Sequence, residues 1–173
     1  MTDQAASSAA GPSTGDPLLD GLIGLGVGLA FNRHLGVEVV ELEVGRAVTR
    51  LPDDGRLHNH LGGVHAIAEL APVELAGALA VSGRLRELLE RGYVPVVGEL
   101  SVRYRAPARG ALTARAEVGP EVVAPALAAA DDGDRPRVEA EVEVTDGDGT
   151  VVAIARLQFV YLDVAAATET SAG

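Results

Sequence analysis

The sequence predicts an α+β fold in which an antiparallel sheet wraps around one long central helix. The second half of the chain alternates apolar and polar residues in several segments, which is the pattern of half-buried strands. Residues 64–81 are instead rich in alanine and leucine and apolar nearly all round, which predicts a buried helix. Strands segregated from one such helix indicate a sheet that covers the helix on several sides.

Local patterns indicate each element in order. The glycine-rich apolar run 18–31 predicts an N-terminal helix, and the polar run 84–91 extends the central helical region. Pro72 predicts a kink or break near Ala68, because proline removes a helical hydrogen bond. Residues 125–136 contain AAADDGD and predict a flexible insertion between strands. The expected strands are 35–44, 46–51, 99–105, 111–118, 138–144 and 151–161, with the turn 146–149 joining the last two.

One domain accounts for most of the 173 residues, which are enough to bury a core. We expect this domain to span residues 16–163. Residues 1–15 are rich in small and polar residues and predict a disordered tail, as do residues 164–173.

Composition excludes several classes of protein. The net charge of −11 and the 3% aromatic content argue against a nucleic-acid partner. The chain has no cysteine, so it has no disulfide or thiolate site, and we expect a cytoplasmic protein. The apolar run 18–31 is too short to span a bilayer and follows no basic residue, so we expect no membrane partner.

Arginine is unevenly distributed along the chain. Residues 84–115 contain seven arginines and three acidic residues, although the chain as a whole is acidic. All the basic residues are arginine and none is lysine. The cluster is either a set of solvated faces or a local site for a small phosphorylated ligand, since the guanidinium fork suits phosphate oxygens.

The segment 59–74, NHLGGVHAIAELAPVE, carries the polar groups with the clearest chemical potential. A polar group on so apolar a segment costs about 1–3 kcal/mol if it is buried without a partner, so each needs a partner or a role. Glu74 shares a helical face with Ile67, Leu70, Gly77 and Val81, which predicts a raised pKa and a candidate base or nucleophile. It could instead be a structural residue bonded to arginine at a subunit boundary.

With this segment as its motif, the chain resembles the hotdog-fold superfamily over about residues 35–161, especially acyl-CoA thioesterases of the phenylacetic-acid-pathway type. The family motif has Asn, Gly and His-Gly-Gly at fixed spacing, and an acidic residue nine positions after His. Asn59, Gly62, His65 and Glu74 match those positions. The strand and turn VRYRAPARG and the hairpin DGDGTVVAIA also resemble the family. The chain departs from the motif where His-Gly-Gly becomes His-Ala-Ile, and this wording is closer to an uncharacterised hotdog branch.

The resemblance implies a thioesterase acting on an acyl-CoA or acyl-carrier substrate, as a homodimer or tetramer and without a cofactor. Glu74, from the partner subunit, would be the base or nucleophile, Asn59 would hold water or the carbonyl, and His65 would have a positioning role. Backbone amides of a helix beginning near His65 would polarise the carbonyl. The residues expected to bind substrate are Gly62, Gly63, Ala66, Ile67, Arg84, Arg103 and Arg105, with the arginines on CoA phosphates.

Other interpretations of these residues remain open. A hotdog dehydratase or isomerase would use His60 with Glu74, and a non-catalytic acyl-binding module would explain the missing Gly-Gly pair. Glu69 lies one helical turn from His65, so we interpret it as structural or as a weaker substitute for Glu74. His58, His60 and His65 lack a carboxylate or cysteine at a metal-ligand spacing, so no metal site is expected.

Overall fold

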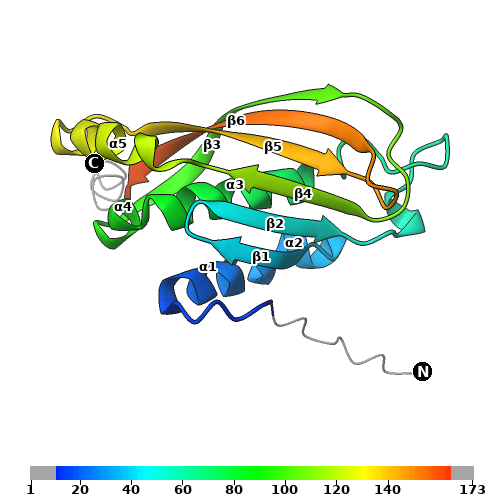
Figure 1. Ribbon diagram of the computed structural model, residues 1–173, viewed down its shortest axis with the longest axis horizontal. Coiled ribbons are helices and arrows are strands. Elements are labelled where there is room, and N and C mark those ends of the chain that lie inside the picture. Colours follow the sequence, from blue (N-terminus) through cyan, green and yellow to red (C-terminus); the bar gives the residue numbers. More distant parts are fainter. Residues whose placement is uncertain (1–10, 165–173) are drawn as a thin grey trace, which may run out of the picture.

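Six antiparallel strands form one curved sheet around a central helix in the computed structural model of the protein, which describes residues 11–164 (Figure 1). The sheet order is β1-β2-β4-β5-β6-β3, and every neighbouring pair is antiparallel. This arrangement confirms the predicted α+β fold. The strands are β1 (Glu38–Glu43), β2 (Arg46–Leu51), β3 (Tyr93–Tyr104), β4 (Leu112–Glu117), β5 (Arg137–Thr145) and β6 (Val151–Asp163).

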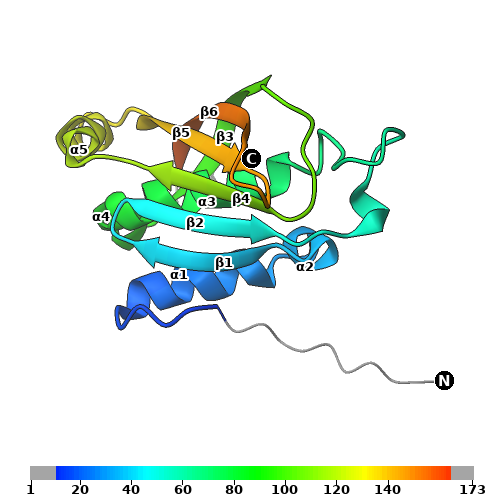
Figure 2. The same cartoon turned by 45° about the vertical axis from the view of Figure 1, so that its right-hand side comes forward.

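The central helix α3 (Leu70–Arg84) lies against the concave face of the sheet, where it contacts β2, β4 and β5 (Figures 1 and 2). Every second side chain of a strand points to this face. In β5 these are the buried residues Val138, Ala140, Val142 and Val144. The largest fully buried side chains include Tyr161, Phe159 and Leu157 of β6. The core therefore sits between the sheet and α3.

Two N-terminal helices, α1 (Pro17–Gly28) and α2 (Ala30–Leu35), lie along the β1 side of the sheet (Figure 2). Helix α1 contacts α3 and β1, and a Cβ atom on Gly26 would lie 2.7 Å from Leu75 of α3, so this glycine permits a close approach. The predicted helix 18–31 is divided between α1 and α2. No helix among residues 11–164 is long and apolar enough to cross a membrane.

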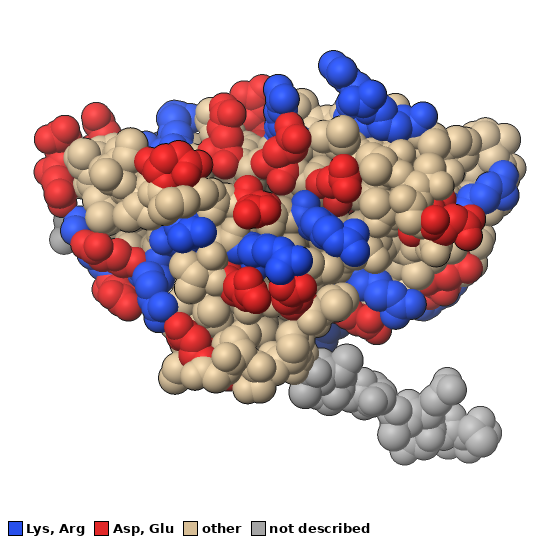
Figure 3. Space-filling view, viewed as in Figure 1, with Lys and Arg blue, Asp and Glu red and all other residues tan. Residues whose placement is uncertain are grey.

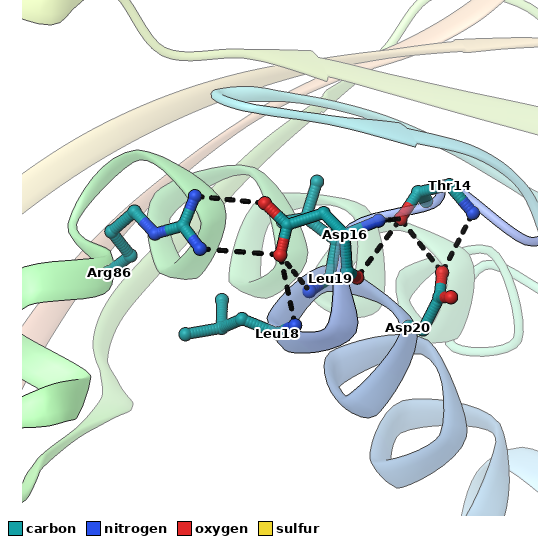
Figure 4. Close-up of polar contacts among 6 residues, drawn as sticks. All are labelled: Thr14, Asp16, Leu18, Leu19, Asp20 and Arg86. Carbon is teal, nitrogen blue, oxygen red and sulfur yellow. Dashed lines mark hydrogen bonds and ion pairs between the residues drawn. The ribbon is translucent and has the colours of Figure 1, made fainter.

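Asp16 caps α1 and ties it to the short helix α4 (Arg86–Glu90) (Figure 4). Its Oδ1 accepts hydrogen bonds from the Leu18 and Leu19 amides, and the Arg86 guanidinium donates to Oδ2 at 2.9 Å. Bonds to Arg86 and to these amides lower the pKa of Asp16. In the predicted N-terminal tail, Thr14 lies within the described residues and its amide donates to Asp20 at 2.7 Å. Residues 1–10 and 165–173 of the two predicted tails lie outside the described residues.

The start of the central helix was predicted wrongly. It begins at Leu70 rather than near His65, and residues 66–69 form turns. Pro72 is therefore the third residue of the helix, where the missing N–H removes no bond from an earlier turn. The predicted kink or break near Ala68 takes the form of a helix that begins after Ala68. The Thr49 hydroxyl of β2 donates to the Pro72 carbonyl at 2.7 Å and fixes this first turn against the sheet.

The predicted flexible insertion is also corrected. Residues 125–136 contain most of helix α5 (Val123–Asp131), which follows the short 3-10 helix η2 (Pro120–Val122). Ala126 is the fully buried residue of α5, and the partly buried Val123, Leu127 and Ala130 also pack against the core. A further 3-10 helix, η1 (Gly55–Leu57), follows β2.

Replacing Thr49 by valine tests the contact that positions the first turn of α3. We expect Thr49→Val to lower the free energy of unfolding by about 1 kcal/mol, because a buried hydrogen bond is lost while the side-chain volume is kept. Urea unfolding of both proteins measures the change. Thr113→Val on β4 is the matched control, since its side chain makes no hydrogen bond among residues 11–164. Equal losses in the two variants would contradict the role of Thr49.

Candidate active site

The loop before α3 is held together by Asn59. Its Nδ2 donates to the Val64 carbonyl at 3.1 Å, and its Oδ1 accepts from the amides of Leu61 at 2.8 Å and Gly63 at 3.3 Å. Gly62 has φ +75°, a conformation that favours glycine. The side-chain amide of Asn59 therefore makes its hydrogen bonds within the loop.

This loop is fixed to its surroundings on two sides. The Val64 amide donates to the Ala108 carbonyl at 2.9 Å, and the His65 amide donates to the Leu57 carbonyl at 2.8 Å. A Cβ atom on Gly63 would lie 2.7 Å from the Ala108 carbonyl oxygen, so a side chain there would break the approach. The sequence-predicted binding residues Gly62 and Gly63 thus shape the loop that leads to His65.

The turn 65–69 follows, and most of its amides are occupied. The Ala68 and Glu69 amides both donate to the His65 carbonyl, and the Ile67 amide donates to Nδ1 of the His65 ring at 3.1 Å. The Ala66 amide makes no hydrogen bond among the described residues, whereas the Ala66 carbonyl accepts from the Tyr104 hydroxyl at 2.8 Å. Of the amides expected to polarise a carbonyl, that of Ala66 remains available.

Glu74 lies on the one stripe of α3 that the fold leaves partly open. Leu70, Glu74 and Ala78 are half-buried, and the residues between them are fully buried. This spacing of four residues defines one helical face. Within residues 11–164 the Glu74 carboxyl makes no hydrogen bond or ion pair, and burial raises its pKa. The stripe thus presents one desolvated carboxyl without a partner.

Glu69, interpreted from the sequence as structural or as a weaker substitute for Glu74, is deeply buried. Its side chain is 4% exposed, and no group of the described part of the chain bonds to the buried Oε2. Burial raises its pKa to about 7. A carboxylate at a helix start usually accepts from the second or third amide, but here Ala71 donates to Ala68 and Pro72 has no N–H. The proline three residues after Glu69 was the sequence signal for this unpartnered state.

The three candidate arginines do not lie together. Arg84 is at the opposite end of α3 from the turn, and its Nε donates to the Val118 carbonyl at 2.9 Å. Arg103 alternates with Tyr104 on β3, so it points to the outer face of the sheet. Arg103 and Arg105 line a hollow of about 390 Å³, and neither guanidinium has a partner in the described residues. The hollow is completed by Ser101, Val102, Glu141, Ile154 and Arg156.

Arg156 was not among the predicted site residues, although it borders the same hollow. Its Nε donates to Glu141 at 3.0 Å. Acidic and basic side chains are interspersed over the face of the sheet in Figure 3. The two unpaired guanidiniums of the hollow are therefore a local excess of positive charge on an acidic protein.

The histidines of the predicted site have different surroundings. His58 pairs with Asp53 at 2.8 Å, and His60 is exposed in the loop. Residues 11–164 contain no group of three or more His, Asp or Glu side chains placed to hold a metal ion.

Residues 24–161 match the model of a protein family described as a domain of unknown function, DUF4442. The chain belongs to this family. The match covers the loop, the turn and α3. No curated protein matches the chain in sequence.

Solved structures show which fold the family's domain adopts. A Pseudomonas aeruginosa protein, PA5026, described as a probable thioesterase, is 24% identical with a TM-score of 0.72, over 88% of this chain and 97% of that one. The thioesterase HI1161 from Haemophilus influenzae is 21% identical with a TM-score of 0.65, over 84% and 91%. PaaI of the E. coli phenylacetic acid degradation operon is 17% identical with a TM-score of 0.59, over 77% and 84%. The expected hotdog fold is thereby confirmed.

Replacing Glu69 by glutamine is expected to change how stability depends on pH. Because burial raises the pKa of Glu69 from 4.5 to about 7, the native protein favours the neutral acid and loses stability as pH rises through this range. Above pH 7 the variant should be more stable than the wild type by up to about 3 kcal/mol, and the two should converge below pH 4.5. Urea unfolding between pH 4 and 8 measures this difference. A constant difference across the range would contradict the burial of an uncompensated carboxyl.

Proposed function

We propose that the protein hydrolyses acyl thioesters, with acyl-CoA as the substrate class. The observation that carries this proposal is the pair of unoccupied groups beside the start of α3, namely the Ala66 amide and the Glu74 carboxyl. A free amide donor can stabilise charge that develops on a thioester oxygen, and a desolvated carboxylate is a stronger base than one in water. The hotdog fold, shared with proteins described as thioesterases, supports the same chemistry.

The proposed reaction needs few groups. The substrate carbonyl oxygen accepts a hydrogen bond from the Ala66 N–H. Ionised Glu74 either takes a proton from the attacking water or attacks the carbonyl carbon itself. The C–S bond then breaks, and the departing thiolate takes up a proton, while water provides the oxygen of the acid product. His65 positions the turn through its Nδ1 bond to the Ile67 amide, and Asn59 holds the loop.

A homodimer is the proposed assembly. Strand β3 forms one edge of the sheet, with no strand of residues 11–164 along its outer side, and Val94, Val96 and Val97 on it are exposed. A long apolar edge strand favours pairing with another chain. A second copy paired there would also approach the open stripe of α3, so that Glu74 could serve the partner's Ala66 amide. A tetramer of two such dimers and a cytoplasmic location remain further expectations of the same proposal.

Arg103 and Arg105 are the proposed contacts for CoA phosphates. They flank Tyr104, whose hydroxyl bonds to the Ala66 carbonyl, so the outer hollow and the turn meet at the same end of β3. With the phosphates bound at the hollow, the thioester end of the acyl-CoA would pass around the edge of β3 and reach Ala66. Arg84 is omitted from this role because it lies at the far end of α3.

Ile67 favours a second candidate function, an acyl-binding module without turnover. Its side chain is 64% exposed directly after the free Ala66 amide, where the thioesterase motif has glycine. A branched side chain there restricts how closely a thioester can approach. Two results together would distinguish this function from hydrolysis. The protein would bind a non-hydrolysable acyl-CoA, and an ordinary acyl-CoA would remain intact after long incubation with it.

Glu74→Gln tests the proposed base. We expect the variant to lose about 10²–10⁴-fold in kcat on its best acyl-CoA, because the amide cannot accept the proton. Thiol release from a panel of acyl-CoAs measures the rate. Glu139→Gln on β5 removes the same charge from an exposed position and should leave the rate unchanged. Full activity of the Glu74 variant would refute its role.

Arg103→Gln combined with Arg105→Gln tests the phosphate contacts. We expect KM for an acyl-CoA to rise about tenfold or more, since each charge-assisted contact is worth roughly 1.5–3 kcal/mol. KM for the same acyl group on pantetheine, which lacks the nucleotide, should not change. Arg33→Gln, an exposed arginine of α2, is the control. A parallel rise for both substrates would remove the hollow from the proposal.

A further inference from the structure

Glu69 is the buried ionisable group that the proposed reaction does not use. It is the last residue of the turn 65–69 and directly precedes α3. Its amide donates to the His65 carbonyl at 3.2 Å, so its backbone closes the turn that contains Ala66. Any movement of Glu69 therefore acts on the segment that presents the free Ala66 amide.

The surroundings of Glu69 penalise a charged carboxyl more than a neutral one. Its side chain is 4% exposed, and its Oε2 has no partner among residues 11–164. The two amides that a carboxylate would use at a helix start are occupied at Ala71 and absent at Pro72. A buried charge without partners costs more than the hydrogen bonds of one turn contribute, so ionisation favours rearrangement of the turn.

Tyr104 connects this carboxyl to the backbone of Ala66. Burial raises the pKa of Tyr104, and the negative charge of Glu69 raises it further. The Tyr104 hydroxyl donates to the Ala66 carbonyl at 2.8 Å. Tyr104 from β3 is the titratable group whose pKa responds to Glu69, and His65 lies in the same turn, where its carbonyl accepts the Glu69 amide. No charged group adds to burial as a cause of the raised pKa of Glu69 itself.

We propose that Glu69 is a positioning residue: its neutral carboxyl keeps the turn 65–69 in the place that presents the Ala66 N–H, and its ionisation releases that turn. The catalytic part of this inference rests on the proposed thioester hydrolysis. Glu74 must be ionised to act and Glu69 neutral, so the two carboxyls define opposite limbs of one pH profile. Activity should rise with ionisation of Glu74 and fall with ionisation of Glu69.

The first experiment follows the Ala66 amide without substrate. In ¹H–¹⁵N correlation spectra of the full chain between pH 5.5 and 8.5, we expect the Ala66 resonance to shift with a midpoint near pH 7. Glu69→Gln keeps the shape and neutrality of the side chain and should abolish this titration. It retains His65, so a shift that persists in the variant reports His65 and overturns the proposal. An Ala66 resonance that does not move in the wild type overturns it as well.

The second experiment measures hydrolysis of the preferred acyl-CoA over the same range. Wild-type kcat should fall by about tenfold per pH unit above pH 7, with KM nearly unchanged, whereas Glu69→Gln should stay level. Glu139→Gln is the control and should follow the wild type. Absence of turnover in every protein would defeat the proposed function, but the amide titration would still decide the role of Glu69. An identical alkaline fall in wild type and Glu69→Gln would contradict it.

Discussion

The burial of α3 within the curved sheet is the constraint on which the rest of the structure depends. The sheet covers one side of the helix and α1 covers another, so its apolar residues are removed from water on nearly every face. Before the last residue of the helix, Arg84, the stripe of Leu70, Glu74 and Ala78 is what stays partly open. A carboxyl on that stripe is desolvated by its neighbours and still reachable, which is the combination that a base requires.

The polar residues before α3 separate into those with partners and those without. Asn59 and His65 are bonded within the loop and turn, where they hold the backbone in place. Glu74 and the Ala66 amide have no partner within the described residues, and Glu69 has a buried oxygen without one. The bonded residues form a scaffold, and the unbonded groups are those left for substrate or proton chemistry.

Sequence patterns predicted the sheet and the buried helix because alternation and an all-round apolar helix leave few other arrangements. They misplaced the helix start because residues 65–69 have the same apolar, alanine-rich composition as the helix itself. Pro72 was read as a kink because its meaning depends on that start. Helix α5 was missed because its alanines resemble a linker, and Arg156 because the hollow joins strands that are distant in sequence. The burial of Glu69 depends on packing that no local pattern contains.

A crystal structure with a non-hydrolysable acyl-CoA ketone tests the central claim most directly. The account predicts that the ketone oxygen accepts a hydrogen bond from the Ala66 amide. It also predicts that a Glu74 carboxylate, from the second copy across β3, lies within hydrogen-bond reach of the position from which water attacks the carbonyl carbon. The phosphates should lie at Arg103 and Arg105. A ketone bound away from the Ala66 amide, or a Glu74 carboxylate sealed against a guanidinium at the subunit boundary, would contradict it.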